Sequence, residues 1–102
     1  MLIFNTTYHV EDSIDNAYLD FMKTIYIPQV SEGGFLFEAR LAKIHPQHEE
    51  TGKSYSLQFK VKNIDTLNYW LSGDGSKLNK VLVDKFGSKV ASFITILQEI
   101  EL

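Results

Sequence analysis

The chain has 102 residues, of which 44% are hydrophobic and 23% charged, as expected of one globular domain over residues 1–102 and not of a disordered chain. It has no cysteine, which excludes disulfides, thiolate metal sites and a cysteine nucleophile, and which suits a reducing cytoplasm. The formal net charge of -3 disfavours non-specific binding to nucleic acid or to acidic membranes.

The first third of the chain predicts a strand and a helix. Side chains of residues 2–9 alternate between two faces, as they do in a strand. Asp12 and Ser13 are good N-cap residues, and proline disfavours a helical residue before it, so a helix should begin near Asp12 and end at Pro28. Its apolar stripe, at spacings of three and four, consists of Ile14, Ala17, Tyr18, Phe21, Met22 and Ile25.

Two strands with a polar connection between them come next, after the glycine pair at residues 33–34. The first covers residues 35–44. The second covers residues 54–61, where large apolar and polar side chains alternate strictly. Regular alternation also predicts two faces for the first of these strands: Phe35, Phe37, Ala39 and Leu41 on one, and Leu36, Glu38, Arg40 and Ala42 on the other.

The last third of the chain predicts two helical pieces and a strand. Asn63 or Asp65 begins a short helix that breaks over residues 72–75, and a second helical piece covers residues 76–86. The final strand covers residues 89–101. It is expected to carry Phe93, Thr95 and Leu97 on one face and Ile94, Ile96 and Ile100 on the other.

The order β-α-β-β-α-β predicts an α+β, ferredoxin-like fold, in which a four-stranded antiparallel sheet carries both helices on one face. The helix-covered face is expected to hold Phe4, Tyr55, Leu57, Phe59, Phe93 and Leu97. The open face would expose large aliphatic side chains, a common mark of an interface, so we expect a homodimer that closes sheet against sheet as a dimeric α/β barrel. The residues assigned to the open face are Ile3, Leu36, Ile94 and Ile96, with Asn5, Thr7, Glu38, Arg40 and Gln58.

Five stretches of the sequence carry a resemblance: Met1 to Val10, Tyr18 to Lys23, Tyr26 to Val30, Thr51 to Phe59 and Lys85 to Gly87. They resemble a family of short bacterial proteins of unknown function, and the match extends over nearly the whole chain. The resemblance implies a dimeric α/β barrel and supplies no reaction. The family often has histidine where this chain has Tyr26, and tryptophan at the positions of Tyr18 and Phe21, which weakens any proton-transfer role implied for Tyr26.

The open face also offers candidate ligand-binding residues. Polar side chains from neighbouring strands should project together there and, enclosed in a dimer, could orient a small ligand among apolar groups. The alternative is that Glu38 and Arg40 pair with each other or with the partner subunit, and that Asn5 and Gln58 satisfy backbone groups, because buried polar groups must be paired in any case. The candidates are Asn5, Thr7, Arg40 and Gln58.

Three residues are candidates for acid–base catalysis: His9, Tyr26 and Glu38. Tyr26 also belongs to a second possible pocket, between helix and sheet. An aromatic stripe at helical spacing is more often core than a cofactor site, and we interpret it as core. The residues around that second pocket are Tyr18, Met22, Tyr26 and Trp70.

Two short motifs are set aside. Residues 45–49, His-Pro-Gln-His-Glu, have the residue types of a metal site, but Pro46 and the position between two strands predict a solvated loop. Residues 51–54, Thr-Gly-Lys-Ser, resemble the end of a phosphate-binding loop, but a strand follows where that loop needs a helix. We therefore expect no metal and no cofactor.

Three functions are compatible with these features, and whether the protein is an enzyme stays open. The first is a cytoplasmic homodimer that binds a small, partly aromatic metabolite. The second is an enzyme of the cofactor-independent monooxygenase or isomerase type, by analogy of fold alone. The third is a nucleic-acid-binding module, which would need Phe4, Tyr55 and Phe59 on the open face. No secretion signal is expected at Met1, and no run approaches the ~20 apolar residues of a membrane-spanning helix.

Overall fold

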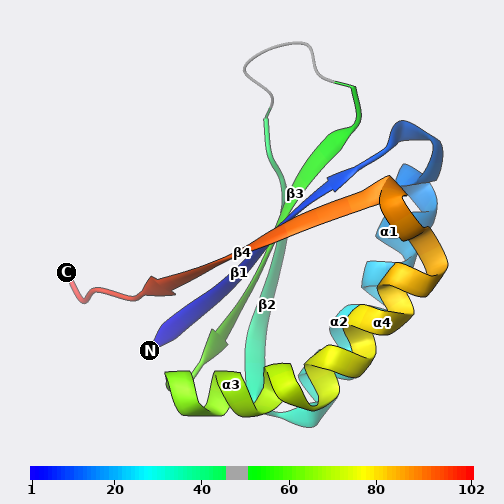
Figure 1. Cartoon of the computed structure of the whole chain (residues 1–102). Coiled ribbons are helices and arrows are strands. Elements are labelled where there is room, and N and C mark those ends of the chain that lie inside the picture. The colour runs from blue at the N-terminus through cyan, green and yellow to red at the C-terminus, as the bar shows by residue number, and fades with distance from the viewer. Residues whose placement is uncertain (46–50) are drawn as a thin grey trace.

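The computed structural model describes residues 1–45 and 51–102, and its elements follow the order that the sequence predicts. Two helical segments connect the strands and lie on the same side of the sheet (Figure 1). The fold is therefore the predicted α+β, ferredoxin-like arrangement. The single antiparallel sheet, in the order β2-β3-β1-β4, consists of β1 (Leu2–Val10), β2 (Leu36–Lys43), β3 (Lys53–Val61) and β4 (Val90–Gln98).

The first helical segment does not end at Pro28, so that prediction is wrong; the segment continues to Gly33. Before Pro28 the helix widens into a π turn, in which the Ile27 N–H donates to the carbonyl oxygen of Met22, five residues back. Pro28 then stands in the first turn of the next helix, where a missing N–H costs little. The parts are a 3-10 turn (Asp12–Ile14), α1 (Asp15–Phe21), the π turn (Met22–Tyr26) and α2 (Ile27–Gly33).

The second helical segment consists of α3 (Ile64–Ser72) and α4 (Asp74–Phe86), separated at Gly73. Asn63 is the N-cap of α3, because its side chain accepts a hydrogen bond of 2.8 Å from the Thr66 N–H. Figure 1 shows that α3 and α4 meet at an angle along the same side of the sheet. None of the helices in the described part of the chain is long and apolar enough to cross a membrane.

The hydrophobic core lies between these helices and the two central strands. In β3 the predicted alternation is confirmed: every second side chain is buried, from Tyr55 to Val61. Full burial of one such side chain stabilises the fold by roughly 1.5–3 kcal/mol. The buried residues of β1, β3 and β2 on this face are Phe4, Tyr8, Val10, Tyr55, Leu57, Phe59, Val61 and Leu36.

Strand β2 contains a bulge that its sequence pattern does not reveal. Its register with β3 shifts between Phe37 and Arg40, and Glu38 within the shift has a positive φ of 52°. One extra residue reverses the faces of the strand on either side of it. Leu36 is therefore fully buried under the helices and not on the open face, where the sequence analysis placed it, and Phe37 lies on the open face instead.

Strand β4 forms one edge of the sheet, and its two faces are the reverse of those predicted. Its register with β1 places Ile94 and Ile96 on the helix side, and Phe93 and Leu97 on the open face. The helices do not extend over this strand, so all four side chains are exposed. Apolar residues occur on both faces of this uncovered strand, so alternation alone cannot show which face points toward the helices.

The bulge gives the first prediction. Glu38→Gly should be more stable than Glu38→Ala by about 1 kcal/mol, because glycine has no Cβ to oppose a positive φ. Both variants lose the same ion pair with Lys60, so the difference between their free energies of unfolding isolates the backbone effect. Urea unfolding of the two proteins measures it. At the neighbouring position, Ala39→Gly should destabilise the protein. If glycine were more stable than alanine at both positions, a bulge centred on Glu38 would be contradicted.

Candidate functional site

A pocket of about 490 Å³ opens between the helix-covered face of the sheet and helices α3 and α4, beside β4. It exists because the helices cover β1 but stop short of β4. The volume is within the roughly 300–1,000 Å³ typical of small-molecule sites. None of the described side chains that line it is charged. Its aromatic lining comes from Phe4, Tyr8, Tyr26, Trp70 and, at the edge strand, Phe93, and its polar lining from Thr6, Ser76, Asn79 and Ser92.

Trp70 forms one wall of the pocket and depends on a close contact with α4. A Cβ at Gly75 would lie 2.6 Å from Cζ3 of the Trp70 ring, so only glycine allows α4 to begin this close to the indole. On its other side Trp70 packs edge to face against Phe4, with ring centroids 5.9 Å apart. The indole is thus fixed between a strand and a helix turn.

Two buried tyrosines belong to the lining of the pocket. They are Tyr26, the last residue of the π turn, and Tyr8 of β1. Burial raises the pKa of Tyr8 and of Tyr26 above the ordinary value for tyrosine, because it penalises the phenolate. Both groups therefore stay neutral near pH 7 and can orient a ligand by hydrogen bonds.

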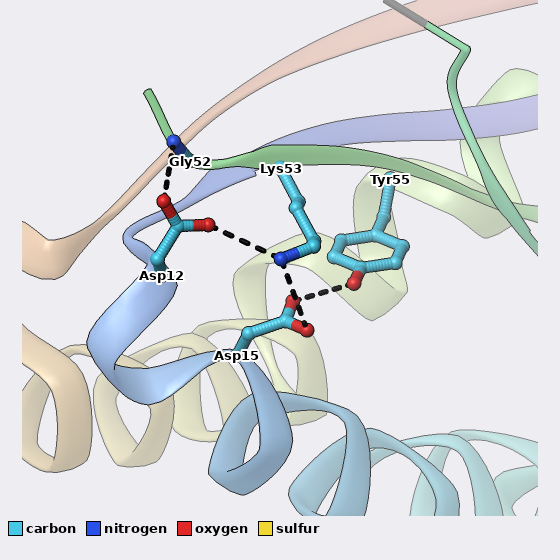
Figure 2. Close-up of polar contacts among 5 residues, drawn as sticks. All are labelled: Asp12, Asp15, Gly52, Lys53 and Tyr55. Atoms are coloured by element: carbon cyan, nitrogen blue, oxygen red, sulfur yellow. Dashed lines mark hydrogen bonds and ion pairs between the residues drawn. The ribbon is translucent and has the colours of Figure 1, made fainter. Parts of the chain in front are cut away.

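Behind Tyr8 the aromatic packing continues to the start of β3. Tyr18 contacts Tyr8 and stacks on Tyr55, whose hydroxyl donates a hydrogen bond of 2.5 Å to Asp15 (Figure 2). Burial, followed by this bond, raises the pKa of Tyr55 to about 12. Among the described residues nothing pairs with the buried Tyr18 hydroxyl. Lys53 lies 4.0 Å from the Asp15 carboxylate. Asp15 and Tyr18 of α1 thus contact Lys53 and Tyr55 of β3 and connect the helix to the sheet.

A second carboxylate closes the same corner of the molecule. Asp12 accepts hydrogen bonds from Nζ of Lys53 and from the N–H of Gly52, both at 3.2 Å (Figure 2). The Lys53 hydrogen bond, then that of Gly52, lowers the pKa of the Asp12 carboxyl. These contacts hold the first turn of the helical segment against the beginning of β3.

The four predicted ligand-binding residues lie together on the open face. The strand register places Asn5 opposite Gln58 and Arg40 beside Gln58. Asn5 already has protein partners: its amide donates to Thr7 at 3.3 Å, and its carbonyl oxygen accepts from Ser56 at 2.5 Å. Asn5 and Thr7 are therefore paired within the chain, whereas Arg40 and Gln58 make no side-chain hydrogen bond or ion pair among the described residues.

A small hollow of about 170 Å³ on the open face is lined by Ile3, Arg40, Gln58 and neighbouring charged groups. Glu38 pairs there with Lys60 at 3.0 Å, and Glu99 approaches the same Nζ to 3.5 Å. Glu38 thus uses its carboxylate on Lys60. The two acidic neighbours raise the pKa of Lys60 and keep it protonated.

The three candidate acid–base residues do not form one site. Tyr26 lies in the pocket on the helix side, whereas Glu38 lies at the β2 bulge near the open-face hollow. His9 is exposed at the far end of β1, with Nδ1 3.0 Å from the Ser54 hydroxyl. Among the described residues no cluster of acidic and histidine side chains could hold a metal ion. His48 and Glu49 of the candidate metal motif lie outside the described residues.

The second pocket of the sequence analysis corresponds to part of this site. Tyr26 and Trp70 line the observed pocket, whereas Tyr18 and Met22 are fully buried core residues. Sequence reasoning missed the polar lining that β1 supplies. The available signal was the pair of hydroxyl side chains, Thr6 and Tyr8, on the otherwise apolar face of that strand.

Two comparisons identify proteins that this chain is similar to. Residues 1–100 match the family described as a domain of unknown function, DUF4286. The crystal structure of a candidate antibiotic biosynthesis monooxygenase from Deinococcus radiodurans superposes with a TM-score of 0.72 at 12% sequence identity. The alignment covers 100% of this chain and 95% of that one, and identity this low shows the shared fold alone. No curated protein matches the sequence.

The contact between Trp70 and α4 gives a second prediction. Gly75→Ala should destabilise the protein by about 1–3 kcal/mol and change the emission of Trp70, because the added methyl group displaces the indole. Trp70 is the only tryptophan, so fluorescence during urea unfolding reports both effects. Gly33→Ala is the matched control, since a Cβ there meets nothing within 4 Å. An unchanged Trp70 spectrum in Gly75→Ala would refute the assigned wall of the pocket.

Proposed function

We propose that this chain, which belongs to the DUF4286 family, is a cytoplasmic homodimer that binds a small, uncharged, partly aromatic metabolite. The observation that carries the proposal is the pocket over β1, which combines aromatic walls with neutral polar groups. Pockets of this make-up usually orient small organic ligands by a few hydrogen bonds.

The neutral lining defines the kind of ligand. A charged group that entered this pocket would leave water without meeting an opposite charge, and such burial is costly. The rings of Trp70, Tyr8 and Tyr26 favour a flat, partly aromatic molecule. The hydroxyl groups of Tyr8 and Tyr26 favour a ligand with an oxygen atom that can hydrogen-bond to them.

A monooxygenase-like enzyme is the second candidate, and the name of the Deinococcus radiodurans neighbour favours it. General-base chemistry near pH 7 works best with a pKa near the operating pH. The pKa values of Tyr8 and Tyr26 are shifted upward, away from that range, and His9 and Glu38 lie outside the pocket. These features favour binding over catalysis.

A homodimer is supported by the composition of the open face. Phe93 is 63% exposed, and Leu97 and Phe37 lie on the same face beside Asn5 and Gln58. A two-fold contact of sheet against sheet would cover these side chains. The aromatic side chains Phe4 and Phe59 are buried under the helices, so they are not available for stacking on nucleic-acid bases.

The third prediction tests the ligand class with two probes of the same ring system. At pH 7, uncharged 2-naphthol should bind at least about tenfold more tightly than the anion 2-naphthoate, a difference of about 1.4 kcal/mol. Isothermal titration calorimetry measures both affinities. Gly75→Ala should weaken naphthol binding, and Gly33→Ala should not.

Equal affinities for the two probes would contradict the neutral pocket. If Gly75→Ala leaves the affinity for naphthol unchanged, the naphthol site lies elsewhere on the protein. Native mass spectrometry of the purified protein adds an independent readout, because a retained small mass would identify the natural ligand directly. Turnover of that ligand, abolished by Tyr26→Phe, would favour the enzyme over the binding protein.

The fourth prediction concerns the open face. Phe93→Glu should convert a dimer at micromolar concentration into a monomer, because it places a charge in the centre of an apolar contact. Sedimentation velocity measures the change. Val81→Glu is the control, since Val81 is similarly exposed, at 47%, but lies on α4 away from the sheet. A monomeric wild-type protein would rule out the homodimer.

A further inference from the structure

We propose that Tyr8, Tyr18 and Tyr55 form a path that carries a one-electron oxidation from the pocket to Tyr55, whose proton passes to Asp15. The path begins at the pocket, because Tyr8 lines it. It ends at the corner of the molecule drawn in Figure 2, where Tyr55 meets Asp15. The inference requires an oxygen-centred organic radical in the pocket, whatever molecule gives rise to that radical.

Ring contacts connect the three tyrosines without a gap. The centroids of Tyr8 and Tyr18 are 5.6 Å apart, and those of Tyr18 and Tyr55 are 5.4 Å apart with an interplanar angle of 28°. Electron transfer slows steeply with distance, so adjacent rings give the fastest route through the core. All three rings are buried, which excludes competing reactions with solvent along the way.

Only the last tyrosine of the path has a base to take its proton. An oxidised phenol is a strong acid, and it becomes a stable neutral radical only where a neighbouring group accepts that proton. The Asp15 carboxylate lies 2.5 Å from the Tyr55 hydroxyl. In the described part of the chain the Tyr18 hydroxyl has no partner, and the pocket that Tyr8 lines holds no carboxylate or histidine side chain. The oxidation therefore comes to rest on Tyr55.

The complete step balances with an oxygen-centred organic radical in the pocket as the oxidant. That radical takes one electron from Tyr8 and becomes an anion, which is protonated by water. The electron is replaced along the path from Tyr55. Tyr55 is left as a neutral phenoxyl radical, and its proton resides on Asp15. The consequence is that an oxidising equivalent moves away from Trp70 and from the bound ligand.

A photo-oxidant attached at the pocket tests the path directly. The chain has no cysteine, so Ser76→Cys provides one attachment point, at the pocket, for a ruthenium polypyridyl label. All samples also carry Tyr69→Phe, because Tyr69 is 68% exposed and could otherwise be oxidised directly. After flash oxidation with persulfate as electron acceptor, electron paramagnetic resonance should show a phenoxyl radical that Tyr55→Phe abolishes.

Two further variants distinguish the path from simple packing. Asp15→Asn keeps the shape but removes the base, and it should lower the yield of the Tyr55 radical at least tenfold. Tyr18→Phe interrupts the path and should slow formation of that radical at least tenfold in transient absorption. Phe86→Leu, which alters packing beside Tyr18 without removing a tyrosine, should leave the rate within twofold. Circular dichroism confirms that each variant is folded.

The opposite results would overturn the proposal. A wild-type radical that rests on Trp70 or Tyr8 would show that Tyr55 is not the end point. Yields that Asp15→Asn leaves unchanged would remove the role of the carboxylate. A rate that Tyr18→Phe leaves unchanged would remove the path. None of these outcomes bears on whether the pocket binds an uncharged ligand, so the two proposals stand or fall separately.

Discussion

The structure depends on how far two helical segments extend across a four-stranded sheet. They cover the helix-side faces of β1 and β3 and the buried end of β2, where large side chains alternate into the core. They leave β4 uncovered, and its residues from Ala91 to Gln98 are all exposed. The pocket lies where the helix layer ends, over the helix-side face of β1 and beside β4. The position of the site therefore follows from the limited width of the helix layer.

Two local irregularities of the backbone then place individual side chains. The π turn over Met22–Tyr26 lets the helix pass Pro28 and ends at Tyr26, which lines the pocket. The β2 bulge gives Glu38 a positive φ and directs its carboxylate to Lys60 beside the open-face hollow. Irregularities of both kinds cost stability and occur often at functional sites, because they aim side chains that a regular element would point elsewhere.

The same features separate what the sequence could predict from what it could not. The pattern of β3 defines its buried face, because one row is apolar and the other polar. Asn63 is recognisable as an N-cap. Leu36 is misplaced because one extra residue in a bulge leaves no signal in the pattern of apolar residues. Tyr26 and Trp70 were identified but interpreted as core, since hydrophobic spacing describes which residues face inward and not where packing leaves a cavity.

The edge strand β4 belongs to both surfaces that the proposed function uses. Ile94 lies on the helix side by the pocket, while Phe93 and Leu97 lie on the open face that would meet a partner subunit. Because successive side chains of one strand share a backbone, covering Phe93 would also restrict the pocket wall at Ile94. In the proposed function the dimer contact would lie on the open face and the ligand on the helix side, and Phe93, which is also part of the pocket lining, would connect the two. Association would reduce the motion of the pocket wall and so favour ligand binding, since less conformational entropy would remain to be lost.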